Sequence, residues 1–168
     1  MTPAAPDDEV RALARLDESG AAIVAGVETQ VPAWAESRVR WLLDAWGGAS
    51  VDVRARAEAE SVAAGAAAAD RVVAELRALF ALDPQQQGAT PLEIVRSVYR
   101  EPTAVLQAAG VPPVVRDDFD ERAWPDDVYG LVPRTLGDLG DADLAPLHLA
   151  WGMAKAAVLR ARRARSGA

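Results

Sequence analysis

Apolar residues recur along much of this chain with helical spacing, most regularly between Ala55 and Phe80. The apolar positions in that stretch are Ala55, Ala59, Val62, Ala66, Ala69, Val73, Leu76 and Phe80, separated by alternating steps of four and three. This pattern is typical of a helix that packs lengthwise against another helix. It predicts one long helix over 51–82, with Ser50 as its N-cap.

Shorter apolar patterns predict helices nearer the N-terminus. Apolar residues between Leu13 and Val27 follow a run of acidic residues, which favours the start of a helix. Because glycine destabilises a helix interior by about 1 kcal/mol relative to alanine, we expect either one helix broken near Gly20 or two short ones. Pro32 suits the first position of a further helix, which extends over 33–46 and ends at a pair of glycines.

The C-terminal half contains the clearest local signal. Thr90, Pro91 and Glu93 form the sequence of a capping box, which predicts a helix that ends before Pro102. A short helix over 102–109 and a final helix over 143–163 are also expected. The core positions of the final helix are Leu144, Leu147, Trp151, Ala154 and Val158.

Proline and glycine are too frequent between residues 110 and 140 for a long regular element. We interpret this stretch as an ordered irregular segment that crosses the bundle, and such long segments are often functional. The sequence therefore predicts an all-α fold, a single-domain bundle of five or six helices over 7–165. Residues 1–6 form a disordered leader in this interpretation, and 166–168 form a tail.

Composition narrows the function. The 168 residues include no cysteine, which excludes disulfides, thiolate metal sites and thiol nucleophiles. The chain begins without a signal peptide and has no apolar run long enough to cross a bilayer, so a cytoplasmic location without membrane association is expected. The acidic net charge of −7 disfavours nucleic-acid binding by the whole surface and favours a basic partner.

His148 is the single histidine and the only candidate base for a catalytic triad. Seven residues later on the same helix side, Lys155 would act as a base or nucleophile if burial depressed its pKa. With Trp151, these two residues form a candidate ligand pocket. The alternative, which we favour, is that the stem of Lys155 covers apolar surface while its ammonium meets a carboxylate from 117–143. We assign no catalytic residue, predict no cofactor, and regard enzymatic activity as disfavoured.

Acidic and aromatic residues alternate within the irregular segment. The candidate partner-binding residues are Asp117, Asp118, Phe119, Trp124, Asp126, Asp127 and Tyr129. Their spacing does not match a calcium loop, so we predict no metal site. The mixture suits a docking face for a basic, partly apolar protein.

The final helix ends in a cluster of arginines. Arg160, Arg162 and Arg163 are candidate phosphate contacts. Cations at a helix C-terminus also interact favourably with the helix dipole, and that effect alone is sufficient to explain them. Phosphate contact is the more specific interpretation, and the shortness of the tail and the acidity of the protein count against it.

Two segments, Asp126–Leu131 and Ala150–Ala156, resemble small Ala/Arg-rich helical proteins of high-GC actinobacteria, a family of uncharacterised function. The resemblance extends over residues 90–160. It implies a high-GC bacterial origin and supplies no activity.

The leading hypothesis from the sequence is a non-enzymatic protein-interaction or regulatory domain. Its expected partner is another protein, and a homodimer stays open. One alternative is a nucleic-acid or phosphate-associated protein that uses the Arg-rich helix. A second alternative is a ligand-binding or enzymatic bundle that uses Lys155 and His148.

Overall fold

The structure, a computed structural model, describes residues 6–100 and 144–166, apart from the side chains of eight of them. The elements are α1 (Pro6–Trp46), α2 (Val51–Ala81), α3 (Pro91–Arg96), the 3-10 helix η1 (Ser97–Arg100) and α5 (Leu144–Ser166). The predicted all-α fold is confirmed for these residues, none of which lies in a β-strand. None of the described helices is long and apolar enough to span a membrane. The predicted helix over 102–109 and the irregular segment over 110–140 lie outside the described residues.

The prediction of five or six helices is wrong, since the described residues form four α-helices. The main reason is that α1 is one helix of 41 residues and does not break near Gly20. A Cβ atom at Gly20 would lie 3.2 Å from the Phe80 ring, and one at Gly26 would lie 3.0 Å from Leu144 Cδ2. Both glycines therefore let a neighbouring side chain approach the helix, and this packing outweighs their low helix propensity.

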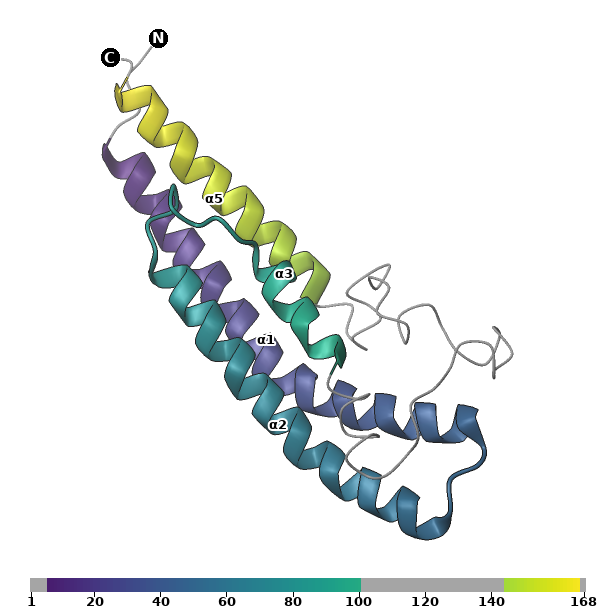
Figure 1. The fold of residues 1–168 in the computed structure, drawn as a ribbon. Helices are drawn as coiled ribbons and strands as arrows, with labels where there is room; N and C mark the ends of the chain where they lie inside the picture. The colour runs from purple at the N-terminus through teal and green to yellow at the C-terminus, as the bar shows by residue number, and fades with distance from the viewer. Residues whose placement is uncertain (1–5, 101–143, 167–168) are drawn as a thin grey trace.

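Pro32 lies inside α1 and does not start a new helix as predicted. Figure 1 shows α1 changing direction where its colour passes from purple to blue. A proline inside a helix removes one backbone hydrogen bond and crowds the preceding turn, which bends the helix. We attribute the change of direction to Pro32.

The long helices run antiparallel to α1. Along α2, Glu28 pairs with Arg77 at 3.2 Å and Asp44 pairs with Arg54 at 2.8 Å. The other neighbour, α5, covers only the first part of α1, and α3 lies between α2 and α5 (Figure 1). The main core therefore fills the half of the bundle where α1, α2, α3 and α5 meet, and the second part of α1 continues beside α2 alone among the described helices.

Buried positions in α1 and α2 follow the same repeat. The buried positions at this spacing are Ala12, Leu16, Gly20, Ile23, Val27, Val31 and Trp34 in α1, and Ala57, Ser61, Gly65, Ala68, Val72, Leu76 and Leu79 in α2. Glu9 in α1 and Ala69 and Val73 in α2 are buried beside this series, and after Trp34 α1 buries Ala35, Val39 and Leu43. In each helix the steps are four, four and three, which is an 11-residue repeat with 3.67 residues per turn.

The sequence-based seam of α2 is therefore only half correct. Its second half, from Ala69 onward, packs into the core, but Ala55, Ala59, Val62 and Ala66 are exposed. A strict seven-residue pattern drifts by about 20° per heptad around a straight helix, so it leaves the interface within a few turns.

Helix ends behave as their local sequences predict. The Ser50 side chain accepts a hydrogen bond from the backbone of Val53, and Thr90 and Glu93 form the complete capping box. After α1, Gly47 adopts a positive φ of 65° that favours glycine at a helix C-terminus. Side-chain chemistry at these ends therefore sets the start of α2 and the start of α3.

Candidate functional site

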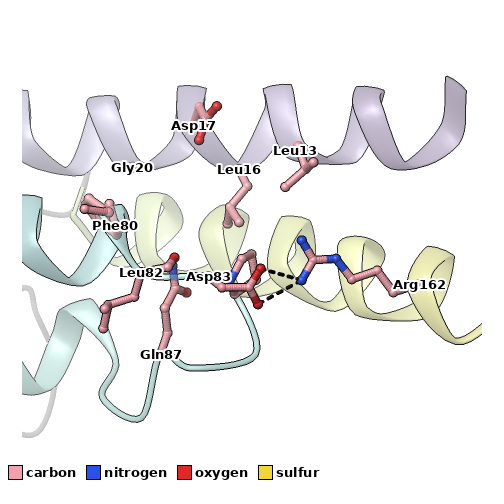
Figure 2. Close-up of a pocket in the computed structure, with 11 residues that line it drawn as sticks. Leu13, Leu16, Asp17, Gly20, Phe80, Leu82, Asp83, Gln87 and Arg162 are labelled. Carbon is pink, nitrogen blue, oxygen red and sulfur yellow. Dashed lines mark hydrogen bonds and ion pairs between the residues drawn. The ribbon is translucent and has the colours of Figure 1, made fainter. Parts of the chain in front are cut away.

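A cavity of about 320 Å³ opens where the first part of α1, the end of α2 with its following loop, and the last part of α5 meet. The lining residues are Leu13, Leu16, Asp17, Gly20, Phe80, Ala81, Leu82, Asp83, Pro84, Gln87 and Arg162. Figure 2 shows α1 on one side of this space and the loop and α5 on the other. An apolar pocket of this size with a few polar groups is typical of a small-molecule site.

Arg162 holds the three elements of the cavity together. Its Nε donates to Glu9 Oε1 at 2.9 Å, and its Nη1 donates to both carboxylate oxygens of Asp83 at 2.8 Å (Figure 2). Arg165 pairs with the second oxygen of Glu9. The Glu9 side chain is only 10% exposed, so these ion pairs are partly shielded from water. They connect the start of α1, the loop after α2 and the end of α5.

The carboxylate of Asp83 is kept ionised by its neighbours. The backbone N–H of Gln85 donates to Asp83 Oδ1 at 2.9 Å, and Arg162 donates from the other side. In that order of importance, these two hydrogen bonds hold the pKa of Asp83 below its ordinary value. The carboxylate therefore stays charged down to a lower pH than a free aspartate.

Gln87 brings a buried polar group to the cavity wall. Gln87 is only 7% exposed, and its Nε2 donates to the backbone carbonyl of Leu82 at 3.2 Å. Among the described residues, no group donates a hydrogen bond to Gln87 Oε1, although this oxygen is buried. Sequence reasoning missed Gln87, because a run of three glutamines after Pro84 indicates only a polar loop.

Lys155 contacts the same loop. Its Nζ donates to the backbone carbonyl of Gln87 at 2.9 Å and lies 5.1 Å from the centre of a Trp151 ring. The ammonium is therefore held by a carbonyl dipole and by a cation–π contact. The predicted carboxylate partner from 117–143 lies outside the described residues.

His148 lies within α5 and is partly buried. Burial lowers the pKa of His148 to about 4, so the imidazole is neutral at neutral pH. Neither of its ring nitrogens has a hydrogen-bond partner within 6–100 or 144–166. The predicted pocket residues His148, Trp151 and Lys155 do not line the cavity, although Trp151 contacts its wall through Phe80, with ring centroids 6.4 Å apart.

The other predicted sites fall in different places. Arg162 is engaged with Glu9 and Asp83, whereas Arg160 and Arg163 are exposed and remain predicted phosphate contacts. The predicted partner-binding residues between Asp117 and Tyr129 lie outside the described residues. In the part of the chain that is described, no cluster of histidine, aspartate and glutamate side chains could hold a metal ion.

The cavity is lined by two carboxylates, one guanidinium group and an aromatic ring, which are groups that bind a ligand by charge and apolar contact. In comparisons with known proteins, no family model, curated protein or solved structure matches the chain.

Proposed function

We propose that this chain is a non-enzymatic protein-interaction or regulatory helical domain whose partner is a basic, partly apolar protein. The observation that carries the proposal is the outer face of α5. There Leu149 is 65% exposed and Met153 is 59% exposed, one turn apart. Large apolar side chains grouped on a surface are typical of an interaction site.

The opposite face of α5 shows that this exposure is not a property of the whole helix. Leu144, Trp151 and Val158 are buried in the bundle. A helix with large apolar residues on both faces is typically covered on both. Among the described helices, the bundle covers one face of α5 and leaves the Leu149–Met153 face exposed, where a partner would bind.

Charge supports a basic partner over a second copy of the chain. The net charge is −7, so two copies would repel each other, whereas a cationic surface would be attracted. In the sequence, the acidic and aromatic stretch from Asp117 to Tyr129 comes shortly before α5. A partner with basic and apolar side chains would complement both the Leu149–Met153 face and this stretch.

A methyl NMR titration tests the proposal directly, because the chain has only two methionines, Met1 and Met153. The probe is a synthetic amphipathic helix of lysine and leucine, and its matched control replaces each lysine by glutamate. We expect the Lys/Leu peptide to shift the Met153 methyl signal and the Glu/Leu peptide to leave it in place. Equal shifts with both peptides, or no shift with either, contradict the proposal.

Surface variants then test whether the Leu149–Met153 face binds natural partners. Leu149→Ser combined with Met153→Ser removes the apolar side chains, and Val62→Ser is the control, since Val62 is 57% exposed on α2. A third variant replaces Asp117, Asp118, Asp126 and Asp127 by serine. Proteins captured from a native lysate by the wild type and by the Val62 variant should be lost with the other two. If recovery does not change among the variants, the proposed function is wrong.

A further inference from the structure

We infer that the cavity between α1, the loop after α2, and α5 binds a small neutral aromatic molecule, which it holds by apolar contact and not by an ion pair. The inference is based on the polar groups of the cavity wall, which are bonded to one another or exposed to water, and on the apolar side chains between them. It concerns a ligand site and does not depend on the protein partner proposed above.

The charges at the cavity offset one another. Together with the groups bonded to them, the described lining residues supply three carboxylates and three cationic groups, which are Glu9, Asp17 and Asp83, and Arg162, Arg165 and Lys155. The Nε and Nη1 donors of Arg162 are used by two of the carboxylates. Asp17 is exposed on α1, and an ion pair at an exposed position contributes little to binding. A charged ligand of either sign would therefore lose its own hydration without an equal gain.

Polar groups of the loop after α2 are used to hold the loop in place. Gln87 Nε2 donates to the Leu82 carbonyl, and Lys155 Nζ donates to the Gln87 carbonyl. Asp83 accepts from the backbone N–H of Gln85. Gln87 Oε1 is buried, so a ligand in the cavity cannot reach it. These contacts fix one wall of the cavity before a ligand enters, which lowers the entropic cost of binding.

Apolar side chains provide the surface that a ligand would contact. Leu13, Leu16, Leu82 and Pro84 line the cavity. Leu82 is 45% exposed although it is a large apolar residue. A ligand that covers Leu82 and fills the cavity would remove apolar surface from water, which is favourable without any charge on the ligand.

Phe80 favours an aromatic ligand over an aliphatic one. In Figure 2 the Phe80 ring lies toward one end of the cavity and the ion pair of Asp83 with Arg162 toward the other. The ring is held between α1 and α5, because a Cβ at Gly20 would lie 3.2 Å from it and the centroid of a Trp151 ring lies 6.4 Å away. A second ring packed on Phe80 would add the energy of an aromatic pair to that of burial. The volume of about 320 Å³ is at the lower end for ligand sites, which favours a ligand of about two fused rings.

Isothermal titration of the full chain with three naphthalene derivatives tests the inference. The probes are 1-naphthalenemethanol, 1-naphthylmethylamine and 1-naphthoate, which share one ring system and are neutral, cationic and anionic at neutral pH. We expect saturable binding of the alcohol at a single site, and affinities for the two ions that are lower by about fivefold or more. Failure of the alcohol to saturate, or equal or tighter binding of either ion, overturns the inference.

Variants locate the binding site. Ala81→Leu adds volume at the cavity wall, where the residue is exposed at the end of α2, and should weaken binding of the alcohol by about tenfold or more. Leu82→Ser removes apolar contact and should weaken it by about fivefold, whereas Val62→Ser, the matched change at an exposed position elsewhere on α2, should leave it unchanged. Thermal midpoints measured by circular dichroism show whether each variant is folded. Wild-type affinity in both Ala81→Leu and Leu82→Ser would place the alcohol elsewhere and overturn the inference.

The same titration separates this site from the proposed protein-binding face. Leu149→Ser combined with Met153→Ser should bind 1-naphthalenemethanol with wild-type affinity, because neither residue lines the cavity. Loss of alcohol binding in this double variant would show that the alcohol binds the Leu149–Met153 face, and would also overturn the inference. A failure of the cavity to bind the alcohol leaves the proposed function as it stands.

Discussion

The two halves of α2 bury different kinds of side chain although they follow one repeat. From Ala68 to Leu79, the buried residues are mostly large and contact a core shared with α1, α3 and α5. From Ala57 to Gly65 they are small, and the backbone of α1 lies so close that a Cβ at Gly65 would be 3.1 Å from Pro32 Cα. The comparison shows that one helix can pack through large side chains where several helices converge and through close backbone contact where only two do.

The ion pairs at the two ends of the bundle also differ, in how well they are shielded from water. At one end, Arg162 is 20% exposed and Glu9 10% exposed. At the other end, Arg54 and Asp44 form a pair on the surface, with side-chain exposures of 36% and 69%. Only the first pair is sheltered enough for its loss to leave a carboxylate away from water.

Leu76→Ala should have the largest effect on stability, because Leu76 lies in the half of α2 that packs into the main core. Leu76 is fully buried, and removing a buried leucine side chain destabilises by about 3 kcal/mol through lost burial and the cavity left behind. Val62→Ala, on the exposed face of the other half, should change the free energy of unfolding by less than about 0.5 kcal/mol. Urea unfolding followed by circular dichroism measures both, and similar losses would show that the two halves do not differ as described.

Arg162→Leu should have the next largest effect. It removes the main partner of Glu9 and leaves only Arg165 beside that shielded carboxylate, which we expect to lower the free energy of unfolding by about 2 kcal/mol. The matched change Arg54→Leu acts on the exposed pair at the other end and should lower it by less than about 1 kcal/mol. The same urea titrations decide, and a larger loss in Arg54→Leu would reverse the ranking of the two ends.

Gly65→Ala sharpens the comparison at the boundary between the two halves. The added methyl group would meet backbone atoms of Pro32 and the Cβ of Ala35, none of which can rotate away. Overpacking by about 2 kcal/mol, offset by about 1 kcal/mol of better helix propensity, predicts a net loss near 1 kcal/mol. In Gly152→Ala nothing lies within 4 Å of the new Cβ, so this control should gain up to about 1 kcal/mol. A thermal midpoint that rises in both variants would contradict the close approach at Gly65.

The smallest expected effect is the dependence of stability on pH, and it comes from His148 on α5. The pKa of His148 is about 4 in the folded chain and 6.5 in the unfolded chain. Between these values the unfolded state binds more protons, so stability is complete above pH 6.5 and falls as the pH is lowered toward 4. Asp83, whose pKa is lowered from 3.8, contributes its loss only below that window.

His148→Phe should therefore flatten the change in urea midpoint between pH 7 and pH 5. Partial exposure of His148 keeps the effect small. If the wild type and His148→Phe show the same slope over this range, another group causes the pH dependence.

Sequence alone predicts the parts of this fold that depend on local chemistry. Ser50 and Thr90 act on backbone N–H groups only three residues away, so their capping roles can be recognised without a structure. The role of Gly20 depends on Phe80, which is distant along the chain, and its low helix propensity therefore misled the prediction of a break. The tertiary contact decides between a glycine that breaks a helix and one that allows close packing.

The residues of the candidate site are harder still to predict from the sequence. Arg162 looked like a phosphate contact because its neighbours in the sequence are basic, but its partners Glu9 and Asp83 lie 153 and 79 residues away. Gln87 carries no motif, and its importance comes from burial that only the folded chain reveals. The helical spacing of the apolar residues predicted the right class of fold, whereas the cavity depends on how α1, α2 and α5 pack against one another.

The shared 11-residue repeat of α1 and α2 also has a consequence for how such a chain can change in length. Eleven residues complete three turns, so a deletion or insertion of that size leaves every remaining side chain at the same angle around the helix axis. In α1 the repeat extends from Ala12 to Trp34, so such a change would have to fall within that range and be matched in α2 between Ala57 and Leu79. Related chains of different size would then be expected to differ there in whole multiples of eleven.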